Sequence, residues 1–148
     1  MTLTETLKQQ HLAVVELVKL IQGAVERDDR ALIETDLKQL KTALLAHLAL
    51  EDAELYPGLE RLGVESGSVN LTLVARQFAS NMSRITEALL SFLDKYDGPI
   101  LDLVGFKQDW SKIVSVLSAR IASEEASLYP LYEKALKAAR RTASRAGQ

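Results

Sequence analysis

The sequence predicts an all-α protein in which four long helices form an up-down-up-down bundle, followed by a short C-terminal helix. Three observations carry this prediction. Leu and Ala dominate while aromatic residues make up only 5% of the chain, and such a composition favours helix over sheet. Apolar residues recur at three- and four-residue steps through four long segments, the spacing of an amphipathic helix. The breaks between these segments are short, so successive helices should run antiparallel.

The first two predicted helices occupy the N-terminal third of the chain. Thr4 is the expected N-cap of the first, whose core stripe is Leu7, His11, Val14, Val18, Ile21 and Val25. The Asp28-Asp29 pair marks the break. The second helix begins near Ala31, with the stripe Ile33, Leu37, Leu40, Leu44, His47 and Glu51. It should end near Tyr56-Pro57-Gly58, because proline lacks an N–H donor and disfavours helix in the residue before it.

A loop is expected over residues 63–70, with Asn70 as the N-cap of the third helix. The third stripe is Leu71, Phe78, Met82, Ile85, Leu89, Phe92 and Tyr96. Asp97-Gly98-Pro99 predicts a turn. The fourth stripe is Leu103, Phe106, Trp110, Ile113, Leu117, Arg120 and Glu124. A break in this helix is expected near Tyr129-Pro130, and a short amphipathic segment should follow over residues 131–141. We expect one domain over residues 1–148, with the bundle at about 4–130 and a basic segment at 131–148.

Composition and charge exclude several functional classes. Cysteine is absent, which excludes disulfides, zinc–cysteine sites and thiol catalysis. No apolar run approaches the roughly 20 residues of a membrane span, and residues 1–5 lack the pattern of a signal peptide, so a cytoplasmic location is expected. The net charge of −2 gives no broad reason to expect nucleic acid binding. The cations of residues 134–145 suit a helix C-terminus; the alternative is a contact surface for an acidic partner.

Five hydrophilic residues fall on the predicted core stripes: His11, His47, Glu51, Arg120 and Glu124. Because burying an unpaired charge costs several kcal/mol, such residues need partners. Two imidazoles with two carboxylates suit iron, manganese or zinc, and His47 and Glu51 are one helical turn apart. A single core histidine, by contrast, is more often simply hydrogen-bonded than a metal ligand.

A repeated motif is more specific. His47-x3-Glu51-x3-Leu-Tyr-Pro57 is echoed by Arg120-x3-Glu124-x3-Leu-Tyr-Pro130. With His11 in the first helix, this motif resembles the hemerythrin-like (HHE cation-binding) family over essentially the whole chain. The resemblance implies a four-helix bundle that holds a non-haem di-iron centre for oxygen binding, sensing or iron handling. It also implies that His11, His47, Glu51 (as bridging carboxylate) and Glu124 are ligands, or Glu125 in the variant with one more intervening residue.

The sequence departs from the family pattern in its second half. Phe78 and Met82 stand on the third-helix stripe where the family has histidines, Arg120 replaces the fourth-helix histidine, and no histidine follows His47. Arginine cannot ligate a metal. The sequence therefore predicts half of a site and no standard di-iron centre. Two states stay open: a metal-free network in which Arg120 bridges the two glutamates, or a mononuclear site with one non-haem iron or another divalent ion.

Two functional hypotheses follow. The first is a non-enzymatic regulatory or interaction module. Its fourth-helix residues Leu117, Arg120, Ile121, Glu124 and Glu125, with Leu55-Tyr56, resemble the Rsd/AlgQ regulators, which implies a protein partner such as a sigma factor. The second is a mononuclear metal protein for oxygen or redox sensing or iron handling, using His11, His47, Glu51 and Glu124. An enzyme is less favoured, because neither histidine has the Glu three residues before it that ferritin-like oxidases use. A homodimer is compatible with both hypotheses.

Overall fold

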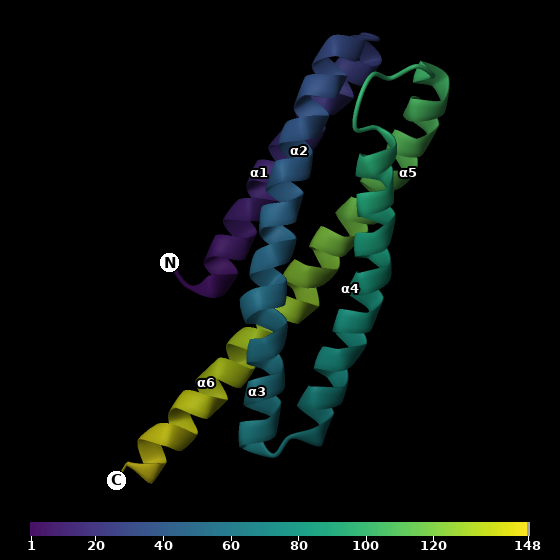
Figure 1. Ribbon diagram of the computed structural model, residues 1–148. Helices are drawn as coiled ribbons and strands as arrows, with labels where there is room; N and C mark the ends of the chain where they lie inside the picture. Colours follow the sequence, from purple (N-terminus) through teal and green to yellow (C-terminus); the bar gives the residue numbers. More distant parts are fainter. Residues whose placement is uncertain (148) are drawn as a thin grey trace.

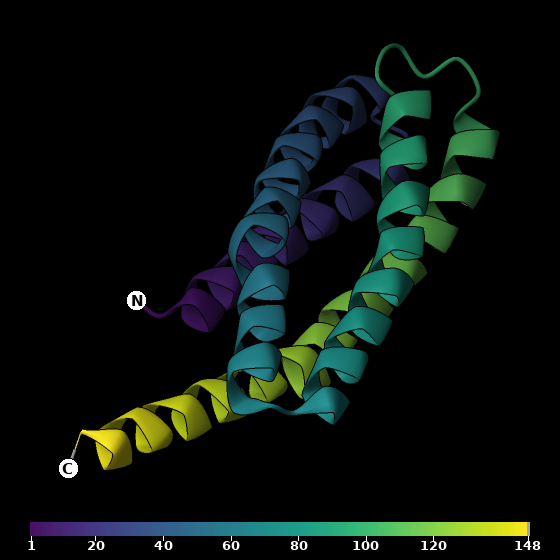
Figure 2. The same cartoon turned by 60° about the horizontal axis from the view of Figure 1, so that its bottom comes forward.

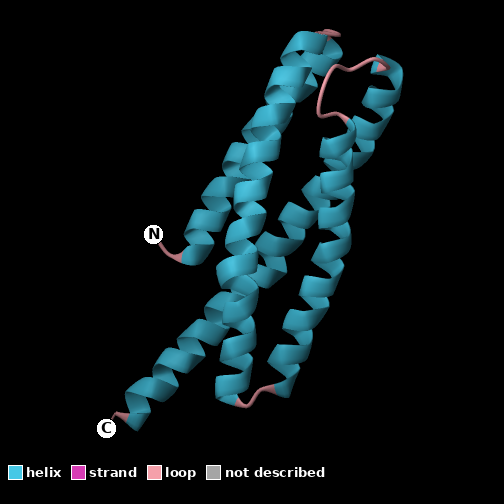
Figure 3. Cartoon of the chain, viewed as in Figure 1, coloured by secondary structure: helices cyan, strands magenta, loops and turns pink. Residues whose placement is uncertain are grey.

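The structure is a computed structural model that describes residues 1–147, and within that range it is helical apart from short turns, with no strand (Figure 3). The elements are α1 (Leu3–Glu26), α2 (Arg30–Leu50), η1 (Glu51–Leu55), α3 (Tyr56–Ser66), α4 (Val69–Lys95), α5 (Leu103–Ser123), η2 (Glu124–Leu128) and α6 (Tyr129–Ala146). Figure 1 shows α1, α2, α4 and α5 running up and down beside one another. The predicted all-α bundle is therefore confirmed. Gln148, the last residue of the predicted basic segment, lies outside the described residues.

Two long helical rods organise the bundle. The first runs through α2, η1 and α3, and the second through α5, η2 and α6 (Figure 1). Both η1 and η2 are single π-helical turns, in which the backbone N–H bonds five residues back: Tyr56 to Glu51, and Tyr129 to Glu124. The repeated sequence motif thus forms the same local structure twice. Beyond these turns, α3 and α6 pack against each other, and Figure 2 shows α6 extending past the bundle to the C-terminus.

The helix ends predicted at the two prolines are wrong. Pro57 and Pro130 lie in the first turn of α3 and α6, which continue the rods. The first turn of a helix tolerates proline, because the N–H that proline lacks is unpaired there. A π-turn carries one extra residue and so resets the hydrogen-bond pattern immediately before each proline. The helix therefore continues past each proline, with α3 ending at Ser66 and the C-terminal helix α6 at Ala146 rather than at the predicted 141.

Two predicted N-caps are also wrong. Thr2, not Thr4, caps α1: its side chain accepts the Glu5 N–H at 3.2 Å while the Glu5 carboxylate accepts the Thr2 N–H at 3.1 Å, a capping box. Thr4 instead lies in the first turn of α1, and its side chain is buried. Ser68 rather than Asn70 caps α4. These cap positions fix where α1 and α4 begin.

The α3–α4 connection is shorter than the loop predicted over 63–70. It consists of Gly67, which ends α3 with a positive φ of 67°, and the cap Ser68. Gly adopts this left-handed conformation without steric cost. The turn predicted at Asp97-Gly98-Pro99 lies where expected, between α4 and α5.

The core consists of two apolar clusters with a polar layer between them. The larger cluster joins α1, α2, α4 and α5 around Trp110, Phe106 and Ile33, and the smaller joins Leu7, Leu55, Leu59, Ala75, Leu128 and Tyr129. On α1, His11 lies between Leu7 of the smaller cluster and Val14 of the larger one. Among the helices of residues 1–147, none is long and apolar enough to cross a membrane.

Candidate metal centre

The polar layer contains all five hydrophilic residues that lie on the predicted core stripes. His11 comes from α1, His47 from α2, Glu51 from the start of η1, Arg120 from the end of α5 and Glu124 from the start of η2. Each has a relative exposure of 3% or less. The two π-turns thus begin at the two glutamates, so that the widened turns present both carboxylates to the interior, as π-turns often do at functional sites.

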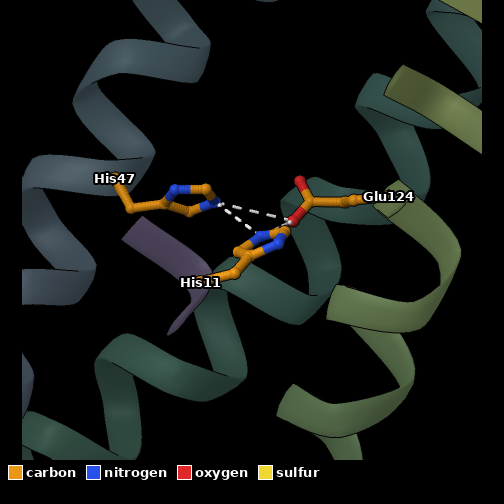
Figure 4. Close-up of side chains that lie close together, drawn as sticks. All are labelled: His11, His47 and Glu124. Atoms are coloured by element: carbon orange, nitrogen blue, oxygen red, sulfur yellow. Dashed lines mark hydrogen bonds and ion pairs between the residues drawn. The ribbon is translucent and has the colours of Figure 1, made fainter. Parts of the chain in front are cut away.

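Three of these residues converge on one point (Figure 4). His11 Nε2 lies 3.1 Å from His47 Nε2 and 3.0 Å from Glu124 Oε1, and His47 Nε2 lies 3.5 Å from the same oxygen. Ligands about 2.1 Å from one ion are roughly 3.0–3.4 Å apart in octahedral or tetrahedral geometry. The spacing of the two nitrogens and the oxygen therefore suits a single metal ion, and two imidazoles with one carboxylate are the ligand set of many non-haem Fe(II) sites.

The outer ring nitrogens orient both imidazoles. His47 Nδ1 lies 2.9 Å from the Gln10 side-chain oxygen, so Nδ1 carries the proton and Nε2 turns its lone pair inward. Burial, the largest influence, lowers the pKa of His47, which keeps the ring neutral and able to ligate. On the other ring, His11 Nδ1 lies 3.5 Å from Glu125 Oε2. Glu125 is 41% exposed and thus lies outside the layer, whereas Glu124 points into it.

Arg120 holds Glu51, the fourth predicted ligand, away from the three converging atoms. Its Nη2 donates to Glu51 Oε1 at 3.0 Å, and its Nη1 donates to the Thr86 hydroxyl at 2.6 Å. Glu51 Oε1 still lies 3.5 Å from His47 Nε2. The structure thus brings the four predicted ligands together, but it places Glu51 at the edge of the cluster that His11, His47 and Glu124 form.

The two glutamates share one proton. Burial, then the hydrogen bond and charge of Glu124, raises the pKa of Glu51 to about 9. Burial acts in the same direction on Glu124, but hydrogen bonds with His11, His47 and Glu51 outweigh it and lower the pKa of Glu124. Two adjacent buried carboxylates cannot both ionise at low cost. With the proton on Glu51, Glu124 and Arg120 balance, and the layer is electrically neutral.

Sequence reasoning placed Tyr129 at a helix break, yet it belongs to this layer. Its side chain is fully buried. The Tyr129 hydroxyl donates to Glu51 Oε2 at 3.1 Å, and this hydroxyl oxygen also lies 3.2 Å from His11 Nε2. Burial raises the pKa of Tyr129, so the phenol stays protonated and donates. The repeated Leu-Tyr-Pro motif was the available signal. Gln10 and Thr86, which support His47 and Arg120, carried no such signal.

Phe78 and Met82, which stand where the family has third-helix histidines, differ in how deeply they are buried. Met82 is buried at 4% exposure, whereas Phe78 is only partly buried and packs against the smaller cluster. Neither offers a nitrogen or carboxylate ligand. Within the part of the chain that the structure describes, His11, His47 and Glu124 are the one group of three or more candidate ligands.

The polar layer lies within a region of the chain that matches a known protein family. The family model of the hemerythrin HHE cation binding domain matches residues 2–132. The chain belongs to the hemerythrin family. Neither the curated proteins nor the solved structures contain a match to it. The match spans all the converging residues and both π-turns, and it ends near the start of α6.

The chemistry of the residues in the polar layer decides how many metal ions this hemerythrin domain can hold. Two inward-facing imidazole nitrogens and a buried carboxylate fit one ion. A second ion beside Glu51 would meet the Arg120 guanidinium, which is positively charged and has no lone pair to donate. The residues of this hemerythrin domain therefore fit one divalent metal and do not fit a pair.

Proposed function

We propose that this hemerythrin-family protein binds a single divalent metal ion, with non-haem iron as the preferred ion, for iron handling or for oxygen or redox sensing. One observation carries the proposal. His11 Nε2 has three polar neighbours, His47 Nε2, Glu124 Oε1 and the Tyr129 hydroxyl, at 3.0–3.2 Å. An imidazole nitrogen has either one proton or one lone pair, so hydrogen bonding alone can serve only one of the three.

A cation at this point would resolve the crowding. With Nδ1 of His47 protonated, its Nε2 presents a lone pair toward His11 Nε2 at 3.1 Å. Among residues 1–147, Glu124 Oε2 and His11 Nδ1 are buried without a hydrogen-bond partner. A divalent ion would draw lone pairs from both imidazoles and from Glu124. Glu125 would then accept from His11 Nδ1, as the outer carboxylate commonly does for a metal-bound histidine.

The remaining residues would tune such a site. The three protein ligands leave coordination positions open, and bound iron would supply redox chemistry there. Arg120 and the Tyr129 hydroxyl hold Glu51 at the edge of the cluster, where its carboxylate can accept protons or approach the ion. Because Glu51 holds the shared proton and Arg120 is permanently charged, metal uptake should be accompanied by proton release at neutral pH.

A matched pair of variants tests the proposal. Protein without a histidine tag is loaded anaerobically with Fe(II), freed of excess metal, and analysed for bound iron. We expect close to one iron per chain in the wild type and in Glu125→Gln, and a large loss in Glu124→Gln and His47→Ala. Glu124 and Glu125 are adjacent, but only Glu124 faces the two imidazoles. Wild-type protein that retains no iron, or equal retention in both glutamine variants, would refute the site.

A second candidate function is a metal-free regulatory module, and the Arg120 network favours it. The layer is neutral without an ion, since Arg120 contacts Glu51 and Thr86 and lies 3.7 Å from Glu124. In that case the bundle would act through a protein partner in the cytoplasm, and α6 offers the cations Lys134, Lys137, Arg140, Arg141 and Arg145 for an acidic surface. Iron-free protein whose thermal unfolding is unchanged by iron would support this function over the first.

A further inference from the structure

The C-terminal part of α6 extends past the bundle as an exposed basic helix (Figure 2). The helix contains one acidic residue, Glu133, and five exposed cations: Lys134, Lys137, Arg140, Arg141 and Arg145. The ion pairs that lysines and arginines form among residues 1–147 involve none of these five. Because α6 carries a charge of +4 and the whole chain −2, the rest of the chain carries −6.

The cations of α6 border a shallow groove of about 400 Å³. Lys134, Lys137 and Arg141 recur at steps of three and four residues and so lie on one face of the helix. Pro130, Glu133 and Ala138 line the same groove. Because lysine and arginine have aliphatic stems below their charged ends, this face offers an apolar strip edged by positive charge. A partner that fits the strip needs exposed apolar side chains flanked by carboxylates.

The opposite end of the same molecule has these properties. Residues 26–36 and 94–109 include the α1–α2 and α4–α5 turns, which lie together at the end of the bundle away from the C-terminus (Figure 1). An ion pair between Asp28 and Lys107 joins the two turns. We call these two ranges the acidic end, because they contain nine Asp and Glu residues against five cations, even with the neighbouring Lys41 included.

Large apolar side chains are exposed within the acidic end. Leu101 is 88% exposed and Val104 is 70% exposed. The same end contains the exposed carboxylates of Glu26, Asp29 and Asp102, and the ion pairs formed by lysines and arginines of the described chain involve none of the three. An apolar centre with a charged rim is typical of a protein–protein contact. The acidic end therefore complements the groove of α6 in both polarity and charge.

Other partners fit α6 less well. A helix that binds a membrane surface inserts bulky apolar side chains, whereas residues 138–146 contain no apolar side chain larger than alanine. A nucleic acid would have to approach a chain whose remaining residues carry −6, and this charge repels phosphates. The acidic end of a second copy meets neither obstacle.

We propose that two copies of this chain associate through a contact between α6 of one copy and the acidic end of the other. Because the two surfaces lie at opposite ends of the molecule (Figure 1), two copies that lie side by side and antiparallel make the contact twice. A contact made twice in this way closes the assembly as a dimer. The contact involves no residue of the polar layer, so the proposal goes beyond the metal site.

Sedimentation velocity of the metal-free, 148-residue protein tests this proposal. The wild type should dimerise in the micromolar range at about 0.1 M NaCl and at least about tenfold more weakly at about 1 M NaCl, where charges are screened beyond about 3 Å. Arg141→Glu should weaken dimerisation by at least about tenfold. Arg84→Glu makes the same change at an exposed position in the middle of α4, away from both ends, and should leave the dimer intact.

An exchange of charges tests whether these two surfaces meet each other. Glu26→Lys should weaken self-association, yet an equimolar mixture of Glu26→Lys and Arg141→Glu should form a mixed dimer, because opposite charges then face each other in both contacts. Leu101→Ser leaves every charge in place and removes part of the apolar centre. It should also weaken dimerisation, and it gives an independent check should a charge reversal disturb a helix.

Three results would each overturn the proposal: monomeric wild-type protein at about 0.1 M NaCl, equal weakening by Arg141→Glu and Arg84→Glu, or no association between Glu26→Lys and Arg141→Glu. Monomeric wild-type protein that instead binds polyglutamate would assign α6 to a different acidic partner. Because the assay contains no metal, these outcomes are independent of iron retention and distinguish failure of this proposal from failure of the metal site.

Discussion

Replacement of Arg120 by alanine probes the polar layer most directly. The side chain is 3% exposed and makes hydrogen bonds of 3.0 Å to Glu51 and 2.6 Å to Thr86. A hydrogen bond that involves a charged group contributes about 1.5–3 kcal/mol. Arg120→Ala also leaves the Glu124 carboxylate buried without a cation. Breaking a buried ion pair from one side costs about 3–5 kcal/mol, and we expect a loss of that size.

Denaturant and thermal unfolding of the metal-free protein at pH 7 measure this loss. For a domain of this size, about 3–5 kcal/mol corresponds to a fall in Tm of roughly 6–20 °C. Arg76→Ala is the matched control, because Arg76 forms an exposed ion pair with Glu60, and such pairs contribute about 0–1 kcal/mol. If Arg120→Ala changed stability no more than Arg76→Ala does, Arg120 would not be the cation that neutralises the layer, and the reasoning would be refuted.

Two further predictions concern the same layer. The pKa of Glu51 is raised to about 9, so folded protein holds a proton that unfolded protein releases above about pH 4.5. The free energy of unfolding of the metal-free protein should therefore fall between pH 7 and 9 by about 1 kcal/mol per pH unit. Glu51→Gln should flatten this slope, and an equal slope in that variant would contradict the assignment. The lowered pKa of His47 contributes stability that is lost below about pH 6.5, outside this window. Tyr129→Phe removes the donor to Glu51 Oε2 and should cost about 0.5–1.5 kcal/mol by urea unfolding, while Tyr132→Phe at a half-buried position should cost less.

The sequence predicted the number and order of the bundle helices because apolar periodicity is a local property of the chain. It failed at the helix ends near Pro57 and Pro130, where proline was expected to stop the helix. A π-turn at Glu51–Leu55 and another at Glu124–Leu128 shift the hydrogen-bond pattern, and periodicity does not report such a shift. The caps failed by two residues at Thr2 and Ser68, where several capping residue types stand close together.

The candidate site was predictable where a hydrophilic residue interrupted an apolar stripe. His11, His47 and Glu124 were found in this way. Tyr129 was not, because it lies beyond the predicted fourth stripe, at the expected helix break. Gln10 lies beside the stripe, and the packing of α1 against α2 brings its side-chain oxygen to 2.9 Å from His47 Nδ1.

The sequence by itself determined the helical bundle, the family and the five hydrophilic residues of the polar layer, because each depends on residue type and on spacing along one helix. Which of those residues meet at one point was decided by tertiary structure alone. The distance of 3.0 Å between His11 and Glu124 joins residues 113 positions apart, and it depends on how α1 packs against the second π-turn. The orientation of Glu51 toward Arg120 rather than toward the two imidazoles is likewise a result of packing, because both directions lie within reach of its side chain.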